Sequence, residues 1–246
     1  MIRAIIFDKD GVLLNLEQTW LDSAIAMTYF VSDLTAGKHD ASVFQKIIGI
    51  DENSRRIDPD GMFAAGTSKA QIDAIIAFEP ELEPELRENS ETRKKLRDVF
   101  LNTRETTLGK FGSVANGDVI TPLTALKDAG YKMGVLTNDA EASARRGCAD
   151  IGISQLMDEV IGFDSGFGHK PEPHGFLELC ARFQITPEEA VMVGDTAADR
   201  DAAQAAGAGH FVGISASEYT PRALMGCRHI LPDLTGLPAL IKKLSA

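Results

Sequence analysis

Two aspartates stand one residue apart at the end of an apolar run near the start of the chain, within the stretch IIFDKDGVLL of residues 5 to 14. Asp8 and Asp10 are followed at once by Gly11, which suits a tight turn. Carboxylates are costly at the end of a buried strand unless a metal ion, a hydrogen-bond network or catalysis accounts for them. A strand that ends in a turn would need the glycine but neither acid, so the pair predicts a chemical role.

Acidic residues at alternate positions also begin the calcium-binding loop of an EF-hand. Here Gly11 comes two places too early for that loop, and no Glu stands at its twelfth position. The sequence therefore excludes calcium binding of the EF-hand type.

Other side chains that can do chemistry follow apolar runs later in the chain. They are a hydroxyl, a lysine and two further acids: Thr137, Lys170, Asp195 and Asp199. Added to the first two aspartates, they are the groups that metal-assisted phosphoryl transfer through an acyl phosphate requires. Because the outer oxygens of a phosphoryl group are negative, an aspartate can attack it only when Mg²⁺ and a cation such as Lys170 offset the repulsion. Acid pairs supply the hard oxygen ligands that Mg²⁺ prefers.

The elements that would position these groups are four short apolar runs, at residues 4–8, 131–139, 159–164 and 190–196. Continuous apolar runs are expected of parallel strands covered on both faces. Helix-like segments alternate with the later runs from about Ile120 onward, which predicts an α/β fold with a doubly wound, Rossmann-like parallel sheet. Such a sheet binds ligands at the carboxyl ends of its strands. The residues expected at these ends are Asp8, Thr137, Asp164 and Asp195.

Local signals predict where several helices begin and end. Thr121 is expected to N-cap the helix in TPLTALKDAG, with Pro122 in its first turn and Gly130 after its last residue. Gly207 is expected to end a second helix, in ADRDAAQAA.

The stretch from about Leu16 to Gly112 is rich in helical patterns and contains no convincing strand. Its helical segments are EQTWLDSAIAMTYFVSDL, SKAQIDAIIAF and SETRKKLRDVFLNTRETTL. Ser68 with Gln71 is predicted to form a capping box at the start of the second segment. We therefore expect an all-helical insert after the first strand. The expected domains are an α/β core of residues 1–15 with 113–246, and an inserted domain of residues 16–112.

Composition limits the class of partner. The 246 residues carry a formal net charge of -11, which opposes nonspecific binding to nucleic acid or to anionic membranes. Three widely spaced cysteines without a Cys-x-x-Cys pair indicate neither a disulfide framework nor a zinc site. The strand-like start argues against a signal peptide, and no apolar stretch approaches the roughly 20 residues that span a bilayer. We expect a cytoplasmic protein that acts on a small molecule.

The motifs DKDGV, LTND, HKPEP and GDTAAD, in this order, resemble those of the haloacid dehalogenase superfamily, and within it the phosphoglycolate phosphatase-like members. The resemblance covers the whole chain, with the insert between the first and second motifs. It implies an α/β core with a helical cap. It also implies Mg²⁺-dependent hydrolysis of a small phosphorylated metabolite, phosphoglycolate-like or a sugar phosphate, through an aspartyl phosphate.

The resemblance further implies a role for each matching residue. Asp8 would be the nucleophile, and Asp10 the general acid/base that protonates the leaving alcohol and then activates water. Thr137 and Lys170 would bind the phosphoryl oxygens, helped by the Asn138 backbone. The implied Mg²⁺ ligands are the Asp8 carboxylate, the Asp10 backbone carbonyl, Asp195 and, in or near the metal's shell, Asp199.

The first motif departs from the family pattern at three positions. Lys9 and Val12 replace the commoner Leu and Thr, and Asn15 stands where many members carry an Asp. None of these changes removes a reacting group. Because Asn15 lies at the entry to the insert, hinge or substrate details are expected to differ.

Several other polar residues have weaker claims. Arg56, next to Arg55 in the insert, is a candidate for binding a substrate anion, although paired arginines more often form a solvated face. His169 and His174 flank the lysine motif and are expected to be incidental, because a loop histidine is seldom catalytic. Asp201 is expected to lie on the surface.

Four other functions compete with the phosphatase. A phosphomutase of the same superfamily would share every catalytic residue, and the motifs do not separate the two. A haloacid dehalogenase proper or a phosphonate hydrolase would be expected to lack the acid at Asp10. A phosphorylation-switched signalling domain also uses Asp, Thr and Lys at strand ends but needs only about half this length. The natural substrate and the oligomeric state stay open, a homodimer being one alternative.

Overall fold

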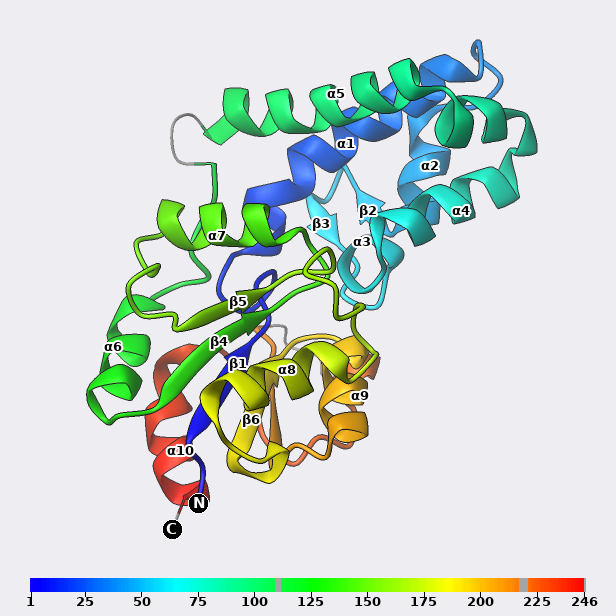
Figure 1. Cartoon of the computed structure of the whole chain (residues 1–246). Coiled ribbons are helices and arrows are strands. Elements are labelled where there is room, and N and C mark those ends of the chain that lie inside the picture. Colours follow the sequence, from blue (N-terminus) through cyan, green and yellow to red (C-terminus); the bar gives the residue numbers. More distant parts are fainter. Residues whose placement is uncertain (109–111, 217–220, 246) are drawn as a thin grey trace. The chain divides into compact units, whose positions relative to one another are not determined.

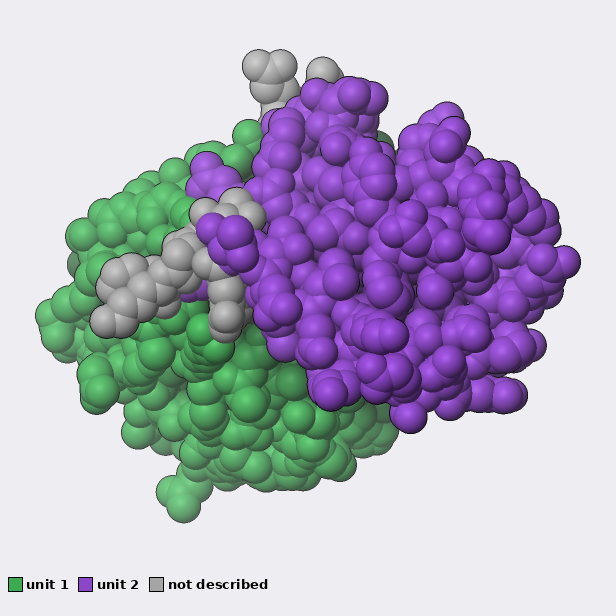
Figure 2. All heavy atoms as spheres, turned by 90° about the horizontal axis from the view of Figure 1, so that it is seen from above, with its two compact units in different colours: residues 1–15, 114–246 green, residues 16–113 purple. Residues whose placement is uncertain are grey.

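The computed structural model describes residues 1–108, 112–216 and 221–245, and the chain divides into two compact units (Figures 1 and 2). The first unit comprises Met1–Asn15 with Val114–Ala246, and the second comprises Leu16–Ser113. Ser113 thus falls in the second unit, whereas the sequence pattern assigned it to the first. Among the described residues, no helix combines the length and the apolar character that a membrane crossing requires.

The first unit is built on a six-stranded parallel sheet in the order β5-β4-β1-β6-β7-β8. Figure 1 labels the strands β5, β4, β1 and β6 of this sheet. In chain order its strands are Ala4–Phe7 (β1), Lys132–Leu136 (β4), Glu159–Ile161 (β5), Ala190–Gly194 (β6), His210–Ile214 (β7) and Ile230–Leu231 (β8). The predicted α/β fold with a doubly wound parallel sheet is confirmed. The segments after β1, β4 and β6 leave the sheet at one edge, because these three strands are parallel neighbours.

Helices cover both faces of this sheet. They are Ile120–Asp128 (α6), Glu141–Asp150 (α7), His174–Phe183 (α8), Ala197–Ala206 (α9) and Leu237–Leu244 (α10), with short 3-10 turns at Pro187–Glu189, Arg222–Leu224 and Leu234–Gly236. Ile5 and Phe7 of β1 pack with residues of α6, α7 and α10, whereas Ala4 and Ile6 pack with residues of α8 and α9. Successive strand residues point to opposite faces, so both faces of β1 are buried.

Two capping predictions were wrong by a few residues. The side chain of Asp118, rather than Thr121, satisfies the start of α6, since the Thr121 backbone N–H donates to Asp118 Oδ1 at 3.1 Å. At the start of α4 (Ser68–Phe78) the capping oxygen belongs to Thr67, which accepts from the Ala70 N–H at 3.1 Å. In both cases the acceptor precedes the first helical residue.

The predicted helix ends at Gly130 and Gly207 are confirmed. Gly207 follows α9 with a φ of 77°, and Gly130 follows α6 with a φ of 87°. Both values lie in the left-handed region, where glycine is favoured because it has no Cβ.

The second unit has its own core. Its helices are Leu16–Leu34 (α1), Ala41–Ile48 (α2), Met62–Ala65 (α3), Ser68–Phe78 (α4) and Ser90–Leu108 (α5), with a 3-10 turn at Pro80–Leu82 and a π turn at Pro84–Glu88. Phe44 and Ile48 of α2 pack with Leu21 of α1 and Ile75 of α4.

The expectation that this insert is all-helical was wrong. Ile50–Asp51 (β2) and Arg56–Ile57 (β3) pair as a short antiparallel hairpin. Asp51 Oδ1 accepts from the backbone N–H groups of Asn53 and Ser54 and so forms the turn. Strands of two residues are too short to leave an alternating pattern in the sequence, so the hairpin escaped detection.

Candidate active site

The turn after β1 holds the first motif and lies beside the end of strand β6. The Asp8 N–H donates to the Val193 carbonyl at 2.8 Å, which continues the pairing of β1 with β6. Gly11 has a φ of 80°, and a Cβ built on it would lie 2.0 Å from Asp195 Oδ2. Only glycine permits this approach. Asn116 Nδ2 donates to the Gly11 carbonyl at 2.7 Å and so holds the turn, a role that the sequence did not reveal.

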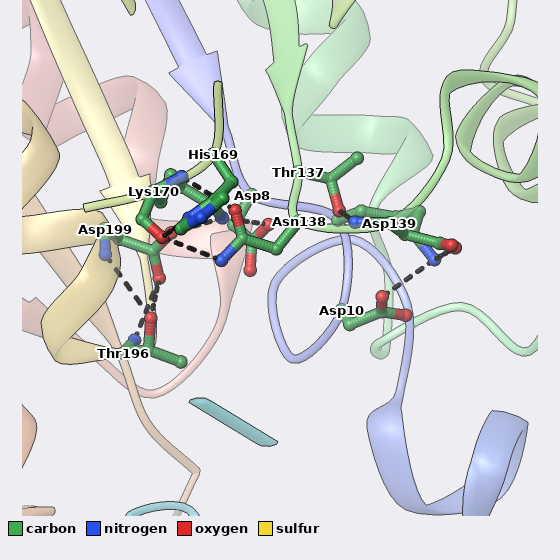
Figure 3. Close-up of polar contacts among 10 residues, drawn as sticks. Asp8, Asp10, Thr137, Asn138, Asp139, His169, Lys170, Thr196 and Asp199 are labelled. Carbon is green, nitrogen blue, oxygen red and sulfur yellow. Dashed lines mark hydrogen bonds and ion pairs between the residues drawn. The ribbon is translucent and has the colours of Figure 1, made fainter. Parts of the chain in front are cut away.

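Lys170 joins two acids from different strand ends in a buried cluster (Figure 3). Its Nζ lies 2.6 Å from Asp8 Oδ1 and 2.5 Å from Asp199 Oδ1. The three residues are 4%, 6% and 0% exposed, respectively. Burial disfavours the ammonium, but the carboxylates of Asp199 and Asp8 outweigh it and raise the pKa of Lys170 above its ordinary value.

Asp199 is held in place by the start of α9. The Thr196 backbone N–H and its Oγ1 both donate to Asp199 Oδ2, at 2.9 and 2.6 Å. The two residues form a capping box, and the Thr-x-x-Asp spacing was a signal for it that the sequence analysis did not use. A Cβ on Gly194 would lie 2.3 Å from the Asp199 Cβ, so the end of β6 also needs a glycine here.

Three acids could hold a metal ion. Asp8, Asp195 and Asp199 each offer one carboxylate oxygen, and these oxygens lie within 4.8 Å of one another. Asp195 Oδ1 is buried with no hydrogen-bond partner among the described residues. Burial, with the charges of Asp8 and Asp199, raises the pKa of Asp195 well above its ordinary value. Burial and the Asp199 charge likewise raise the pKa of Asp8 to about 7.

The cluster groups three carboxylates around the single ammonium of Lys170. Three carboxylates around a single ammonium, with an unpartnered oxygen among them, suit a divalent cation that prefers oxygen ligands. The residues present therefore fit a hard divalent cation.

Asp10 faces a different lysine. Lys9 Nζ lies 2.7 Å from Asp10 Oδ2 and 2.9 Å from Asp139 Oδ2, and the Lys9 side chain is 1% exposed. The acids are less buried, at 23% and 31% exposed. Burial alone would raise the pKa of Asp139, but the Lys9 charge holds it below its ordinary value. The sequence analysis noted Lys9 as a departure but assigned no role to it or to Asp139.

The second motif supports Lys170 from the neighbouring strand end. Asn138 Oδ1 accepts from the Lys170 N–H at 2.8 Å, and Asn138 Nδ2 donates to the Lys170 carbonyl at 3.0 Å (Figure 3). Thr137 is 3% exposed, and its Oγ1 accepts from the Asp139 N–H at 3.1 Å. The Asn138 side chain thus braces the lysine, an arrangement that spacing along the chain could not reveal.

The remaining candidates lie outside this cluster. Asp164 Oδ1 accepts from the Glu141 N–H at the start of α7, which is a structural role. The His174 side chain is 66% exposed. His169 Nδ1 lies 3.1 Å from the Lys170 carbonyl. Asp201 forms an ion pair with Arg200 on the surface.

The arginine candidates belong to the second unit. The Arg56 side chain is 68% exposed, and its Nε lies 3.3 Å from Glu17 Oε1. Arg55 Nη2 lies 2.6 Å from Asp22 Oδ1. The assignment of Arg56 to substrate binding stays a prediction.

Comparison with known proteins gives one family match and several relatives. A family model described as haloacid dehalogenase-like hydrolase matches residues 2–207. A phosphoglycolate phosphatase of Nitrosospira multiformis is 27% identical over 99% of this chain and 97% of its own length. A plasmid-encoded phosphoglycolate phosphatase of Cupriavidus necator is 33% identical over 55% of this chain and 58% of its own length.

Solved structures show the same fold. The crystal structure of a predicted phosphoglycolate phosphatase from Haemophilus somnus 129pt has a TM-score of 0.71 and 24% identity, and the match covers 98% of each chain. That of a putative beta-phosphoglucomutase from Thermotoga maritima has a TM-score of 0.69 and 17% identity, over 98% of this chain and 99% of its own. The family resemblance predicted from the four motifs is confirmed, and with it the prediction of a hydrolytic enzyme.

Proposed function

The chain belongs to the haloacid dehalogenase-like hydrolases, and from this premise we propose that it is a Mg²⁺-dependent phosphatase that forms an aspartyl phosphate on Asp8. The proposed substrate is a small phosphorylated metabolite, phosphoglycolate-like or a sugar phosphate, and the proposed location is the cytoplasm. The observation that carries the proposal is the Asp8 carboxylate, 2.6 Å from the buried Lys170 ammonium and grouped with Asp195 and Asp199.

Mg²⁺, when bound by the carboxylates of Asp8, Asp195 and Asp199 and by the Asp10 carbonyl, would supply positive charge for the phosphoryl oxygens. Lys170 stays protonated, because its pKa is raised, and offsets the repulsion between Asp8 and the phosphoryl group. Thr137 and the backbone at Asn138 are proposed to donate to the same oxygens.

The reaction then has two steps that conserve protons. In the first step an Asp8 oxygen attacks phosphorus and the bond to the leaving oxygen breaks, while Asp10 gives its proton to that oxygen. In the second step water attacks phosphorus, Asp10 takes a proton from the water, and the bond to Asp8 breaks. Both aspartates return to their starting forms, and alcohol and phosphate leave.

We propose that the second unit, Leu16–Ser113, acts as the cap of this enzyme. A cap that closes over the substrate excludes bulk water, which strengthens the charge interactions at the site, and reads the part of the substrate beyond the phosphate. Arg56 is the candidate contact for an anionic group there.

The test is phosphate release from a panel of phosphate monoesters that includes 2-phosphoglycolate, with Mg²⁺ and with EDTA. Wild type and a Lys127→Met control, which removes an ion pair with Asp158 outside the site, should release phosphate only with Mg²⁺. Release that is independent of metal, or no release from any ester, would contradict the proposal. Interconversion of sugar phosphate isomers without net phosphate release would favour the phosphomutase instead.

A further inference from the structure

Lys9 is a buried cation for which the proposed mechanism has no use. Its side chain is 1% exposed, and it is one of the largest fully buried side chains in the described part of the chain. Burying an ammonium is costly unless carboxylates compensate it, and an apolar side chain of similar size often serves packing equally well. A lysine at this position therefore suggests a role beyond packing.

The two carboxylates around Lys9 come from neighbouring strand ends. Asp10 follows β1 and Asp139 follows β4, and the lysine lies 2.7 and 2.9 Å from one oxygen of each. Asp139 is itself fixed by the backbone. Its Oδ1 accepts from the Ala140 N–H at 2.7 Å, and its own N–H donates to Thr137 Oγ1 at 3.1 Å. The ion pairs thus connect Asp10, through Lys9, to an anchored residue of the second motif.

Lys9 and Lys170 form ion pairs with different carboxylates. The ion pairs of Lys170 are with Asp8 and Asp199, the acids of the nucleophile and of the candidate metal group. Those of Lys9 are with Asp10 and Asp139. Figure 3 shows the two groups apart, with Asp10 facing Asp139 and Asp8 facing Lys170. Lys9 is therefore placed to act on the proposed proton-transfer residue.

We propose that Lys9 is a positioning residue that, anchored by Asp139, orients the Asp10 carboxylate for proton transfer to the leaving alcohol and from water. The inference rests on the proposed function, since it assumes that Asp10 is the general acid/base. Orientation matters because a displacement of about 1 Å can cost on the order of 10²-fold in rate.

The test uses Lys9→Met, which keeps an unbranched side chain only one heavy atom shorter than lysine but removes the charge. The matched control is Lys127→Met, which removes a lysine 2.9 Å from Asp158 Oδ1. Turnover of an alkyl phosphate, 2-phosphoglycolate, should fall by about 10- to 100-fold in Lys9→Met with KM nearly unchanged, because an alkoxide needs the acid to leave. The burst of 4-nitrophenol from 4-nitrophenyl phosphate should keep its rate, because that leaving group needs little protonation.

A double variant separates positioning from a general loss of structure. In an Asp10→Asn background, Lys9→Met should cause little further loss, because the residue it positions is already disabled. Asp139→Asn, which weakens the anchor but keeps its hydrogen bond to Ala140, should show the same leaving-group pattern to a smaller extent. If Lys9→Met fails to fold, Asp139→Asn tests the inference by the same comparison of the two leaving groups.

Three results would overturn the inference. The first is a Lys9→Met variant that turns over the alkyl ester as fast as the wild type does. The second is an equal loss of rate for the alkyl and the aryl ester, in the burst as well as in turnover. The third is a double variant in which Lys9→Met lowers turnover as much as it does in the wild-type background. A wild-type protein that releases no phosphate from any ester would instead overturn the proposed function, and this inference with it.

Discussion

Two lysines on the same sheet edge each lie between two carboxylates, yet their surroundings differ. After the proposed roles of Asp8 and Asp10, we call Lys170 with Asp8, Asp195 and Asp199 the nucleophile cluster, and Lys9 with Asp10 and Asp139 the proton-transfer cluster. In the nucleophile cluster the two acids paired with Lys170 are nearly or fully buried, and a third acid adds negative charge. In the proton-transfer cluster the acids are 23% and 31% exposed.

The difference indicates how the proposed mechanism would divide two tasks between the two clusters. A sequestered cluster with excess negative charge is suited to hold a divalent cation and an ammonium against a phosphoryl group. A partly exposed carboxylate, held by one lysine, is suited to exchange protons with an alcohol or with water. Substitutions in the two clusters should therefore give different kinetic patterns, and substitutions outside both should spare the chemistry.

The largest expected effect is in the nucleophile cluster. Asp8→Asn should lower turnover by about 10³-fold or more on every substrate, because it removes the proposed nucleophile while exchanging only an oxygen for an NH₂ group. The measurement is kcat for alkyl and aryl phosphates, with circular dichroism to verify the fold. Retention of more than about a tenth of the wild-type rate would remove Asp8 from the role of nucleophile.

Asp195→Asn should weaken the binding of Mg²⁺ without impairing proton transfer by Asp10. We expect turnover at low Mg²⁺ to fall by roughly 10²-fold and to recover in part at high Mg²⁺, because one of the oxygen ligands loses its charge. The measurement is a Mg²⁺ titration of activity. An unchanged Mg²⁺ requirement would show that Asp195 does not hold the metal.

The same variant gives a readout that needs no substrate. Burial and the neighbouring acids raise the pKa of Asp195 in the folded protein, so its ionised form is disfavoured there relative to the unfolded chain. Stability of the metal-free wild type should therefore fall as pH rises from the ordinary carboxyl range toward the raised pKa. Asp195→Asn should remove part of this fall and raise Tm at pH 8 in EDTA. A lower Tm for the variant under these conditions would contradict the charge excess.

The smallest expected effect lies outside both clusters, in the second unit. If Arg56 contacts a substrate anion, Arg56→Ala should raise KM for an anionic natural substrate by about tenfold, the loss of one charged contact. The aryl ester should be nearly unaffected. Arg87→Ala, which removes another half-exposed arginine of this unit, is the matched control. Equal changes in KM for both substrates, or no change for either, would show that Arg56 does not contact the substrate anion.

Much of the sheet could be predicted from the sequence, because its central strands are short continuous apolar runs. Two outer strands could not. β7 contains His210 and Gly213, and β8 has only two residues, so neither stands out as an apolar run. The short hairpin of the second unit was missed for a similar reason.

The residue types of the site were predictable, but their supports were not. Asp8, Lys170, Asp195 and Asp199 were named from motifs, and the structure brings their side chains together. The pairing of Lys9 with Asp139 depends on β4 lying next to β1. A sequence without strand order does not show which loops become neighbours.

The most direct test of an aspartyl phosphate on Asp8 uses the Asp10→Asn variant with 4-nitrophenyl phosphate. The aryl group leaves without help, whereas the second step lacks its base, so the intermediate should accumulate. We predict a burst of about one equivalent of 4-nitrophenol, then slow turnover. After acid quench and borohydride reduction, peptide mass spectrometry should find homoserine at position 8. An alkyl ester should give a slower burst. A burst with the modification at another residue, or slow turnover without any burst or reduction product, would contradict the nucleophilic role of Asp8.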